Sequence, residues 1–312
     1  MALQAKPIAF KPARLNGLSW RLITSHYENN YGGAVRRLNA IRADLAQLQV
    51  AAVPGFLLNG LKREELIATN SMLLHELYFD GLGGKGGLPD GALGEAIARD
   101  FGSIERWRTE FMAMGRALGG GSGWVVLTRS PRDGTLSNVW QADHTHSLAG
   151  GTPILALDMY EHSYHIDFGA NVAAYVDAFM NNLHWERIGE RFTGAAEAPR
   201  PHMIDTVTAR QRLESEPGLM VIDARLVDDA TLVPVGLKGA RRAPPDKVDA
   251  IAAQLPKGGK ALVYCAWGFE IGGDCAAKLR ERGIDAVAIA GGLGAWRAEG
   301  LPTEPLKEGD KT

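Results

Sequence analysis

One short segment of the chain combines a carboxylate and an imidazole at a spacing suited to metal binding. It reads DMYEHSYH from Asp158 to His165, so Asp158 and His162 are four residues apart. Two more histidines, His26 and His75, lie far upstream in stretches with helical character. Three neutral imidazoles and one carboxylate suit a redox-active first-row metal such as manganese or iron. The sequence therefore predicts a metal site assembled from distant parts of the chain.

The two upstream histidines lie in segments whose apolar side chains recur at helical spacing. Residues 17–48 place apolar and aromatic groups three and four positions apart, which predicts a long helix around His26. Gly32 and Gly33 interrupt this pattern and predict a kink there. A second helix, expected over residues 62–80, carries the other upstream histidine and ends at a glycine-rich loop.

The pattern then changes from helices to a small sheet. The expected elements are a helix over residues 92–118, a β-hairpin over 121–143, a buried strand over 153–160 and a closing helix over 171–192. Helices followed by a small sheet favour an α-helical hairpin over residues 1–90 and an α+β part over residues 91–193, sharing one site.

A second region begins after a short segment rich in proline and small residues. Residues 194–203 are interpreted as a linker, and residues 204–312 as an α/β domain with a parallel sheet. Its expected elements are strands over 219–225, 261–265 and 285–292 and a helix over 273–284.

The composition excludes several classes of protein. The chain has 312 residues, which favours two domains, and 34 basic against 36 acidic residues give no sign of a nucleic-acid or membrane-surface binder. No apolar run is long enough to span a membrane. The N-terminus lacks a signal-peptide core, so a cytoplasmic location is expected. Two cysteines provide no disulfide framework.

Several motifs together resemble the iron/manganese superoxide dismutase family over residues 16–193. They are a histidine ahead of AVRRLN, LLHELYF, GSGW, and DMYEHSYHIDF followed by NLHWERIGERF. The resemblance implies that His26, His75, Asp158 and His162 hold one manganese or iron ion per subunit. It also implies that the substrate is superoxide, which is disproportionated to dioxygen and hydrogen peroxide while the metal alternates between its +3 and +2 states.

The substrate entrance departs from the family's pattern. The family has a histidine four residues after the first ligand and a tyrosine eight residues after it, where this chain has Asn30 and Ala34. The tyrosine that reaches across the dimer to that histidine corresponds to His165. The resemblance therefore implies an Asn30–His165 pair at the gateway. Tyr27 and Tyr31 are expected to point away from the site, because they lie on another face of a regular helix.

A hydrogen-bonding side chain near the metal also differs from the common one. Iron-type members place a glutamine where this chain has Ser71, whereas manganese-type members supply a glutamine or histidine from the hairpin of the second part. His144 occupies about that second position, with His146 as a weaker substitute. We expect His144 to hydrogen-bond to solvent bound at the metal. This arrangement favours manganese over iron.

The resemblance also implies a symmetric homodimer. Glu161 matches a glutamate that bridges to the partner subunit's ligand histidine, here His162. Aromatic walls that exclude water are expected around the site from Trp124, Tyr160, Phe79 and Trp185. The same four rings would also serve as ordinary core packing.

Residues 204–302 resemble a single rhodanese domain. The features that carry this likeness are VIDAR with Asp223 and Arg225, LKGA, the strand ALVYC ending at Cys265, and GGLGAW. The resemblance implies that Asp223 and Arg225 are structural and that Cys265 is a possible sulfur carrier in a cradle of backbone N–H groups. Glu270 stands where active members have arginine, and we expect it to repel thiosulfate. A small anion, a sulfur donor or a protein is the expected partner of this domain.

Three functions follow as hypotheses. The first is a metal-dependent superoxide dismutase with an appended rhodanese-like domain that is atypical or inactive. The second is a sulfurtransferase that uses Cys265 on a degenerate metal domain. The third is a non-catalytic, metal- or redox-sensing dimer. The complete set of four ligands favours the first, and Glu270 argues against the second, whereas Asn30 and Ala34 keep the third open.

Overall fold

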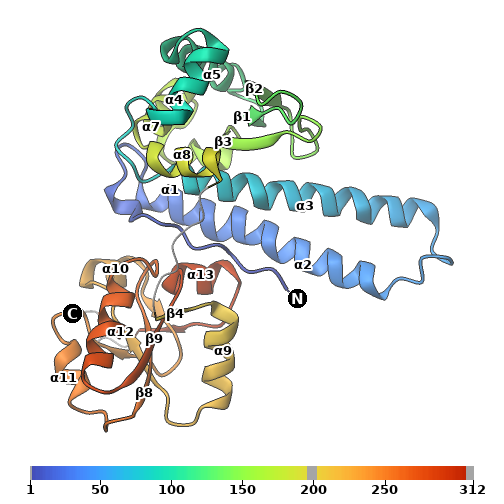
Figure 1. The fold of residues 1–312 in the computed structure, drawn as a ribbon. Coiled ribbons are helices and arrows are strands. Elements are labelled where there is room, and N and C mark those ends of the chain that lie inside the picture. Colours follow the sequence, from blue (N-terminus) through green and yellow to red (C-terminus); the bar gives the residue numbers. More distant parts are fainter. Residues whose placement is uncertain (1, 195–201, 307–312) are drawn as a thin grey trace. The chain divides into compact units, whose positions relative to one another are not determined.

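The chain divides into two compact units in the computed structural model, which describes residues 2–194 and 202–306 (Figure 1). The first unit comprises Met1–Leu3 and Phe10–Glu197, and the second comprises Gln4–Ala9 and Ala198–Thr312. Residues 4–9 therefore belong to the second unit, although the sequence analysis assigned them to the first domain. Most of the predicted linker, residues 195–201, lies outside the described residues.

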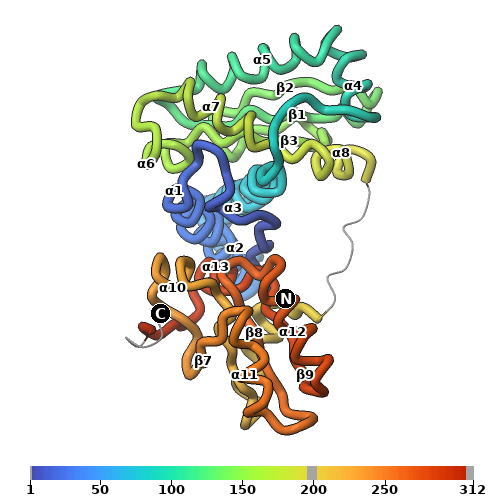
Figure 2. The backbone as a smooth tube through the Cα atoms, turned by 90° about the vertical axis from the view of Figure 1, so that its left-hand side faces the viewer, coloured from blue at the N-terminus to red at the C-terminus, as the bar shows by residue number. Residues whose placement is uncertain are grey.

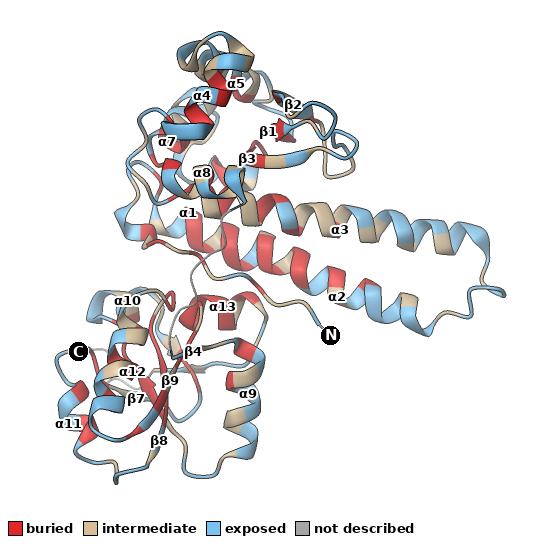
Figure 3. Ribbon diagram, in the orientation of Figure 1, coloured by how far each residue is buried: buried red, intermediate tan, exposed pale blue. Residues whose placement is uncertain are grey.

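The first unit begins with a long helical hairpin. Its elements are α1 (Trp20–Ser25), a π-helical turn (His26–Tyr31), α2 (Gly32–Gln47) and α3 (Gly55–Gly81). The Ser19 side chain caps α1 by accepting a hydrogen bond from the Leu22 N–H. The facing sides of α2 and α3 are buried, whereas the far end of the hairpin is exposed (Figure 3). The buried inner face fixes how the two histidine-bearing helices lie against each other.

The break in the first long helix differs from the predicted kink. The chain passes through Gly32 and Gly33 as regular α-helix, and the irregularity is the π-helical turn immediately before them. Each hydrogen bond of a π-turn spans one more residue than in an α-helix, and such turns often occur at functional sites. This turn begins at His26.

A three-stranded antiparallel sheet follows the hairpin, in the order β2-β1-β3. Its strands are β1 (Trp124–Arg129), β2 (Leu136–Gln141) and β3 (Thr152–Asp158). The sheet packs on α3 through β3, and β1 and β2 lie against the helices α5 (Ile104–Ala117) and α4 (Gly91–Phe101) (Figure 2). The predicted hairpin and strand are confirmed, and so is the arrangement of a helical hairpin followed by an α+β part.

The helices around this sheet are shorter than predicted. The segment 92–118 is two helices, because Gly102 adopts a left-handed conformation (φ 85°) and Ser103 caps a new helix. The segment 171–192 likewise breaks, and His184 caps the second part. The resulting elements are α4 (Gly91–Phe101), α5 (Ile104–Ala117), α6 (His165–Phe168), α7 (Val172–Asn181) and α8 (Trp185–Thr193).

The second unit is built on a five-stranded sheet in the order β4-β9-β8-β5-β7, with every neighbouring pair parallel. Its strands are β4 (Met203–Ile204), β5 (Met220–Asp223), β7 (Arg241–Arg242), β8 (Lys260–Tyr264) and β9 (Asp285–Ile289). A separate pair joins β6 (Val235–Gly236) to β10 (Glu304–Pro305). The predicted parallel sheet is therefore observed.

Helices cover both faces of that sheet, and each face has its own apolar core. One core joins the sheet to α11 (Val248–Ala252) and α12 (Ile271–Glu281), and the other joins it to α9 (Thr206–Ser215) and α13 (Gly292–Ala298). A short helix, α10 (Val227–Leu232), follows β5. Strands buried on both faces explain the continuous apolar runs in the sequence. No described helix of either unit is long and apolar enough to cross a membrane.

Candidate metal centre

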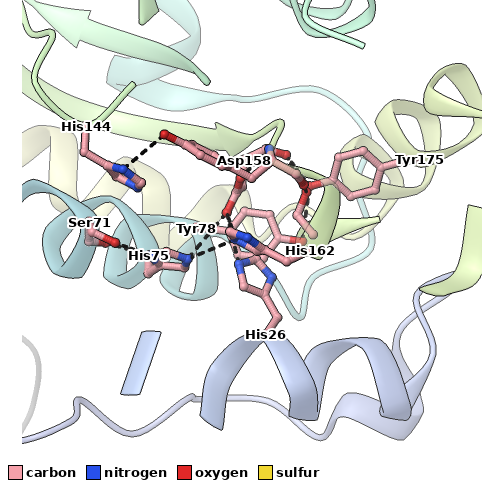
Figure 4. A network of polar contacts seen from close by, with 10 residues as sticks. His26, Ser71, His75, Tyr78, His144, Asp158, His162 and Tyr175 are labelled. Carbon is pink, nitrogen blue, oxygen red and sulfur yellow. Dashed lines mark hydrogen bonds and ion pairs between the residues drawn. The ribbon is translucent and has the colours of Figure 1, made fainter. Parts of the chain in front are cut away.

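Four side chains from three distant segments converge inside the first unit (Figure 4). One nitrogen or oxygen atom from each of His26, His75, Asp158 and His162 can be chosen so that all four atoms lie within 4.8 Å of one another. His26, His75 and Asp158 are buried, and the His162 side chain retains 26% exposure. The structure thus brings together all four predicted ligands.

The sheet places the carboxylate of this cluster. Asp158 is the last residue of β3, and Trp124, the first residue of β1, pairs with both Asp158 and Gln141. The ends of all three strands therefore meet at one edge of the sheet. The backbone N–H of Tyr160 donates to Asp158 Oδ1 at 2.8 Å, which turns Oδ2 toward the histidines.

The histidine nitrogens crowd around this single oxygen. The Nε2 atoms of His26, His162 and His75 lie 3.0, 3.1 and 3.5 Å from Asp158 Oδ2. The Nε2 atoms of His75 and His162 are also only 3.4 Å apart. His75 Nδ1 lies 2.6 Å from the Ser71 carbonyl oxygen, so the N–H of the neutral ring is on Nδ1 and its Nε2 carries a lone pair. A His75 lone pair that faces a carboxylate oxygen at 3.5 Å needs a cation between them, and the donor set fits manganese or iron.

The surroundings keep these groups in the protonation states that a metal requires. Burial lowers the pKa of His75 to about 3, and it also lowers the pKa of His26. Burial works to raise the pKa of Asp158, but its contacts with His162 and His26 outweigh burial and hold that pKa well below its ordinary value. Neutral imidazoles and an ionised carboxylate are the ligand forms that bind a divalent or trivalent metal.

His144 lies beside the cluster, whereas His146 does not. The ring of His144 is 6.4 Å from the ring of His75 and nearly parallel to it. His144 Nδ1 is 3.1 Å from the Tyr160 hydroxyl, and its buried Nε2 has no hydrogen-bond partner among the described residues. His146 is exposed and lies 3.1 Å from Asp143. Of the two candidates for the polar group beside the metal, only His144 is in position.

Aromatic rings enclose the buried side of the cluster. Trp124 is buried and meets His75 edge-on at 5.2 Å between ring centroids, and Phe79 lies 5.0 Å from His26. Tyr160 stacks on His162 at 5.5 Å. Trp185 instead packs on Trp107 at 5.5 Å. Three of the four predicted aromatic groups therefore contact the histidine rings, and they keep bulk water away from this side.

Tyr31 is a site residue that the sequence analysis misplaced. We expected it to point away from the ligands, but its ring lies 6.3 Å from His75 and its hydroxyl donates to Glu76 Oε1 at 3.0 Å. The expectation was wrong because it assumed a regular helix. The π-turn adds one residue to the repeat, so the residue five after His26 returns to the same face. No residue pattern in the sequence marks this turn.

Comparisons with known proteins agree with this geometry. Residues 89–191 match the family model of the C-terminal domain of iron/manganese superoxide dismutases. A protein named superoxide dismutase [Fe] from Cupriavidus metallidurans is 69% identical over 195 residues, which cover 62% of this chain and 98% of that relative. The chain belongs to the iron/manganese superoxide dismutase family. The enzyme class predicted from the sequence is thereby confirmed.

More distant relatives in this family are named for either metal. Superoxide dismutase [Mn] 1 from Halobacterium salinarum is 36% identical over 182 residues, covering 58% of this chain and 89% of the relative. Superoxide dismutase [Fe] from Aquifex pyrophilus is 35% identical over 196 residues, covering 60% and 90%. The family thus supports iron or manganese as the metal, without the preference for manganese that the sequence suggested.

The residues that the family likeness assigned to the gateway and the dimer lie toward the surface. Glu161 and His165 are exposed, and Asn30 is half-buried in the π-turn. Glu161 and His165 line a surface hollow of about 510 Å³ together with Tyr164 and Arg116. The exposed positions of Glu161 and His165 leave both available to a second copy of the chain.

The second unit places Cys265 in a tight loop directly after β8. The thiol is buried, and the Gly268 N–H donates to its Sγ at 3.1 Å. Gly268 has φ 58°, and a Cβ there would lie 2.2 Å from the Gly291 nitrogen, so the loop requires glycine. Trp267 is buried against Gly294, where an added Cβ would lie 2.6 Å from the indole ring. Glu270 is exposed at the N-cap of α12.

Asp223 and Arg225 form a buried ion pair in the second unit. Arg225 Nη2 donates to Asp223 Oδ2 at 2.6 Å, and Nη1 donates to the Val233 carbonyl at 2.8 Å. Arg242 approaches the same carboxylate at 3.3 Å. The pair ties the loop after β5 to the end of its neighbour β7, which is a structural arrangement.

Proposed function

We propose that this protein catalyses the disproportionation of superoxide with one iron or manganese ion per subunit, held by His26, His75, Asp158 and His162. The observation that carries the proposal is the convergence of these four donor atoms within 4.8 Å inside a buried aromatic frame. In the reaction two superoxide anions and two protons become dioxygen and hydrogen peroxide. When bound, the ion supplies the one-electron exchange between its +3 and +2 states that this chemistry needs.

The protein's own residues prepare the site for that exchange. A single carboxylate, Asp158, offsets part of the ion's charge, while neutral imidazoles add none. The Ser71 carbonyl fixes the orientation and the tautomer of His75. Trp124 and Phe79 close the buried side, so the partly exposed His162 marks the side from which a small anion enters.

The iron-named relative at 69% identity favours iron over the manganese preferred from the sequence. His144 beside the cluster is the feature that led to manganese. Loading metal-free protein with each ion separately and comparing superoxide consumption decides between them. Equal activity with both metals would indicate a site that functions with either iron or manganese.

Two matched histidine variants test the proposed ligand set. In His162→Ala we expect bound metal to fall well below one ion per subunit and superoxide consumption to disappear. The control is His146→Ala, because His146 is exposed and outside the cluster, and it is expected to keep both. Metal and activity retained in His162→Ala would overturn the proposal. Stoichiometric metal without activity in the natural protein would instead support the sensing alternative.

We also propose that the enzyme is a symmetric homodimer joined through Glu161. The support is the exposure of Glu161 and His165 close to His162, the most open of the four ligands. In such a dimer Glu161 of one copy would hydrogen-bond to His162 of the other, and Asn30 would face His165. Sedimentation of the natural protein and of Glu161→Ala tests this. A monomeric natural protein would contradict it.

For residues 204–302 we propose a rhodanese-like domain without efficient sulfur transfer. Its support is the parallel sheet, the cysteine loop after β8 and the buried Asp223–Arg225 pair. One N–H contacts the Cys265 sulfur, which favours a thiol-binding loop, but Trp267 is packed in that loop and Glu270 adds negative charge at its exposed end. A thiosulfate–cyanide sulfur-transfer assay with Cys265→Ser as the blank is expected to show no activity above that blank.

A further inference from the structure

Tyr160 contacts both a proposed metal ligand and the histidine beside the metal site. Its ring stacks on His162 at 5.5 Å and on His144 at 4.8 Å, with interplanar angles of 18° and 21°. Its hydroxyl lies 3.1 Å from His144 Nδ1. Figure 4 shows this bond on one edge of the His144 ring. Tyr160 is therefore more than an aromatic wall.

The direction of this hydrogen bond follows from the chemistry of the two groups. A phenol, with an ordinary pKa of about 10, is protonated at neutral pH and can donate its proton. The Tyr160 hydroxyl lies 3.1 Å from His144 Nδ1 and can donate its proton to that nitrogen, which then accepts. The proton of a neutral His144 ring therefore lies on Nε2.

The His144 ring is held in place by its neighbours, but the Nε2–H on its other edge has no acceptor among the described residues. Trp124 packs against the ring at 5.8 Å, and the Asn70 side chain donates to the His144 carbonyl at 2.6 Å. Nε2 is buried and has no hydrogen-bond partner among the described residues. A buried N–H without an acceptor is costly unless a ligand supplies one. The stacked ring of His75 shows that this edge is next to the ligand cluster.

We propose that Tyr160 is a positioning residue that fixes His144 in its Nε2–H tautomer, so that His144 presents one hydrogen-bond donor to a small anion in the metal site. This inference rests on the proposed dismutase function for the identity of the anion, superoxide. The opposite tautomer would turn a lone pair toward an anion and repel it. The orientation of one proton thus determines whether His144 attracts or repels the substrate.

Nitrogen NMR of the metal-free protein tests the tautomer without any activity measurement. With the His144 signals assigned by comparison with His144→Gln, we expect the proton on Nε2 in the natural protein and a mixture of tautomers in Tyr160→Phe. The natural protein with its proton on Nδ1 would overturn the proposal, and that result does not depend on the folding of Tyr160→Phe. Because the experiment needs no metal, its outcome stands even if the proposed function fails.

Azide binding to the metal-loaded protein tests whether His144 donates a hydrogen bond to an anion. The Tyr160→Phe and His144→Gln variants, alone and combined, form a double-mutant cycle. In Tyr160→Phe we expect azide to bind roughly 10-fold more weakly, as befits one lost hydrogen bond. In a His144→Gln background, whose amide donates without help, Tyr160→Phe is expected to change azide affinity less than twofold. Tyr264→Phe, which alters a buried tyrosine of the second unit, serves as the control and should match the natural protein. Equal losses in both backgrounds would show a merely structural role and overturn the proposal.

Discussion

The two units each place a reactive group at the end of a strand, but they surround it differently. In the first unit, Asp158 ends β3 and meets His162 from the turn that follows and two histidines from the helical hairpin, with its second oxygen already bonded by the backbone. In the second unit, Cys265 follows β8 and is surrounded by its own loop, with Trp267 packed in it. The first arrangement leaves donor atoms that need a ligand. In the second arrangement the thiol already has a hydrogen-bond partner within its own loop.

The Asp158 cluster and the Cys265 loop differ in whether their polar groups already have partners. The His75 lone pair that faces the Asp158 carboxylate is costly without a cation, so its presence indicates a ligand. The buried Cys265 thiol accepts a hydrogen bond from Gly268 and is stable as it stands. A cysteine at the right place in a fold is therefore weaker evidence of activity than an incomplete polar cluster.

Removing the carboxylate is expected to have the largest effect. Asp158→Ala should lose the bound metal. Loss of a group that only supports a ligand typically costs roughly 10- to 100-fold in activity, and we expect superoxide consumption to fall by more than this. Metal analysis and an activity assay on the same sample measure this. Asp177→Ala removes an exposed carboxylate paired with Arg116 and should leave both unchanged. Comparable losses of metal and of superoxide consumption in the two variants would contradict a special role for Asp158.

The ion pair in the second unit is expected to matter for stability alone. Arg225→Met leaves Asp223 buried without its main partner and should lower the free energy of unfolding of that unit by roughly 3–5 kcal/mol. Arg280→Met breaks an exposed pair with Asp285 and should cost less than about 1 kcal/mol. Denaturant unfolding of both variants, with superoxide consumption measured beside it, gives the answer. Dismutase activity lost in proportion to stability would show that the two units are coupled.

The metal-free protein should lose stability in mild acid. The pKa of His75 is lowered from 6.5 to about 3 by burial, so between these pH values the unfolded chain binds a proton that the folded chain does not. The free energy of unfolding must then fall as the pH drops below 6.5. Urea unfolding at several pH values checks this, and His75→Gln should flatten the dependence. A metal-free protein with constant stability from pH 7 to 4 would contradict the burial of a neutral His75.

The smallest effect is expected at the cysteine. Cys265→Ser should leave metal content and superoxide consumption within experimental error of the natural protein, because the loop around Cys265 belongs to the second unit. Parallel measurements on the two proteins test this. A clear loss of superoxide consumption in the serine variant would assign the thiol a part in the chemistry.

The sequence predicted which four side chains come together better than it predicted the path of the chain that carries them. His26, His75, Asp158 and His162 lie in motifs whose residue types are dictated by metal chemistry, so they could be found without coordinates. The hairpin strands were also predictable, because their alternation reflects burial on one face. Helix breaks at Gly102 and His184 were missed, since apolar periodicity continues across them.

The details around the ligands could not be predicted, because they depend on local departures from regular geometry. Tyr31 faces His75 only because the π-turn adds a residue to the helical repeat. The contact of Tyr160 with His144 joins a loop to a strand end, and sequence spacing says nothing about it.

Stepwise reconstitution of the metal-free protein tests the central claim most directly. Iron or manganese is added in fractions of an equivalent, and bound metal and the rate of superoxide consumption are measured at each step. The account predicts a rate that rises in proportion to bound metal and reaches a plateau at about one ion per subunit, with His162→Ala remaining inactive throughout. Superoxide consumption that is independent of bound metal, or equal in His162→Ala, would contradict it.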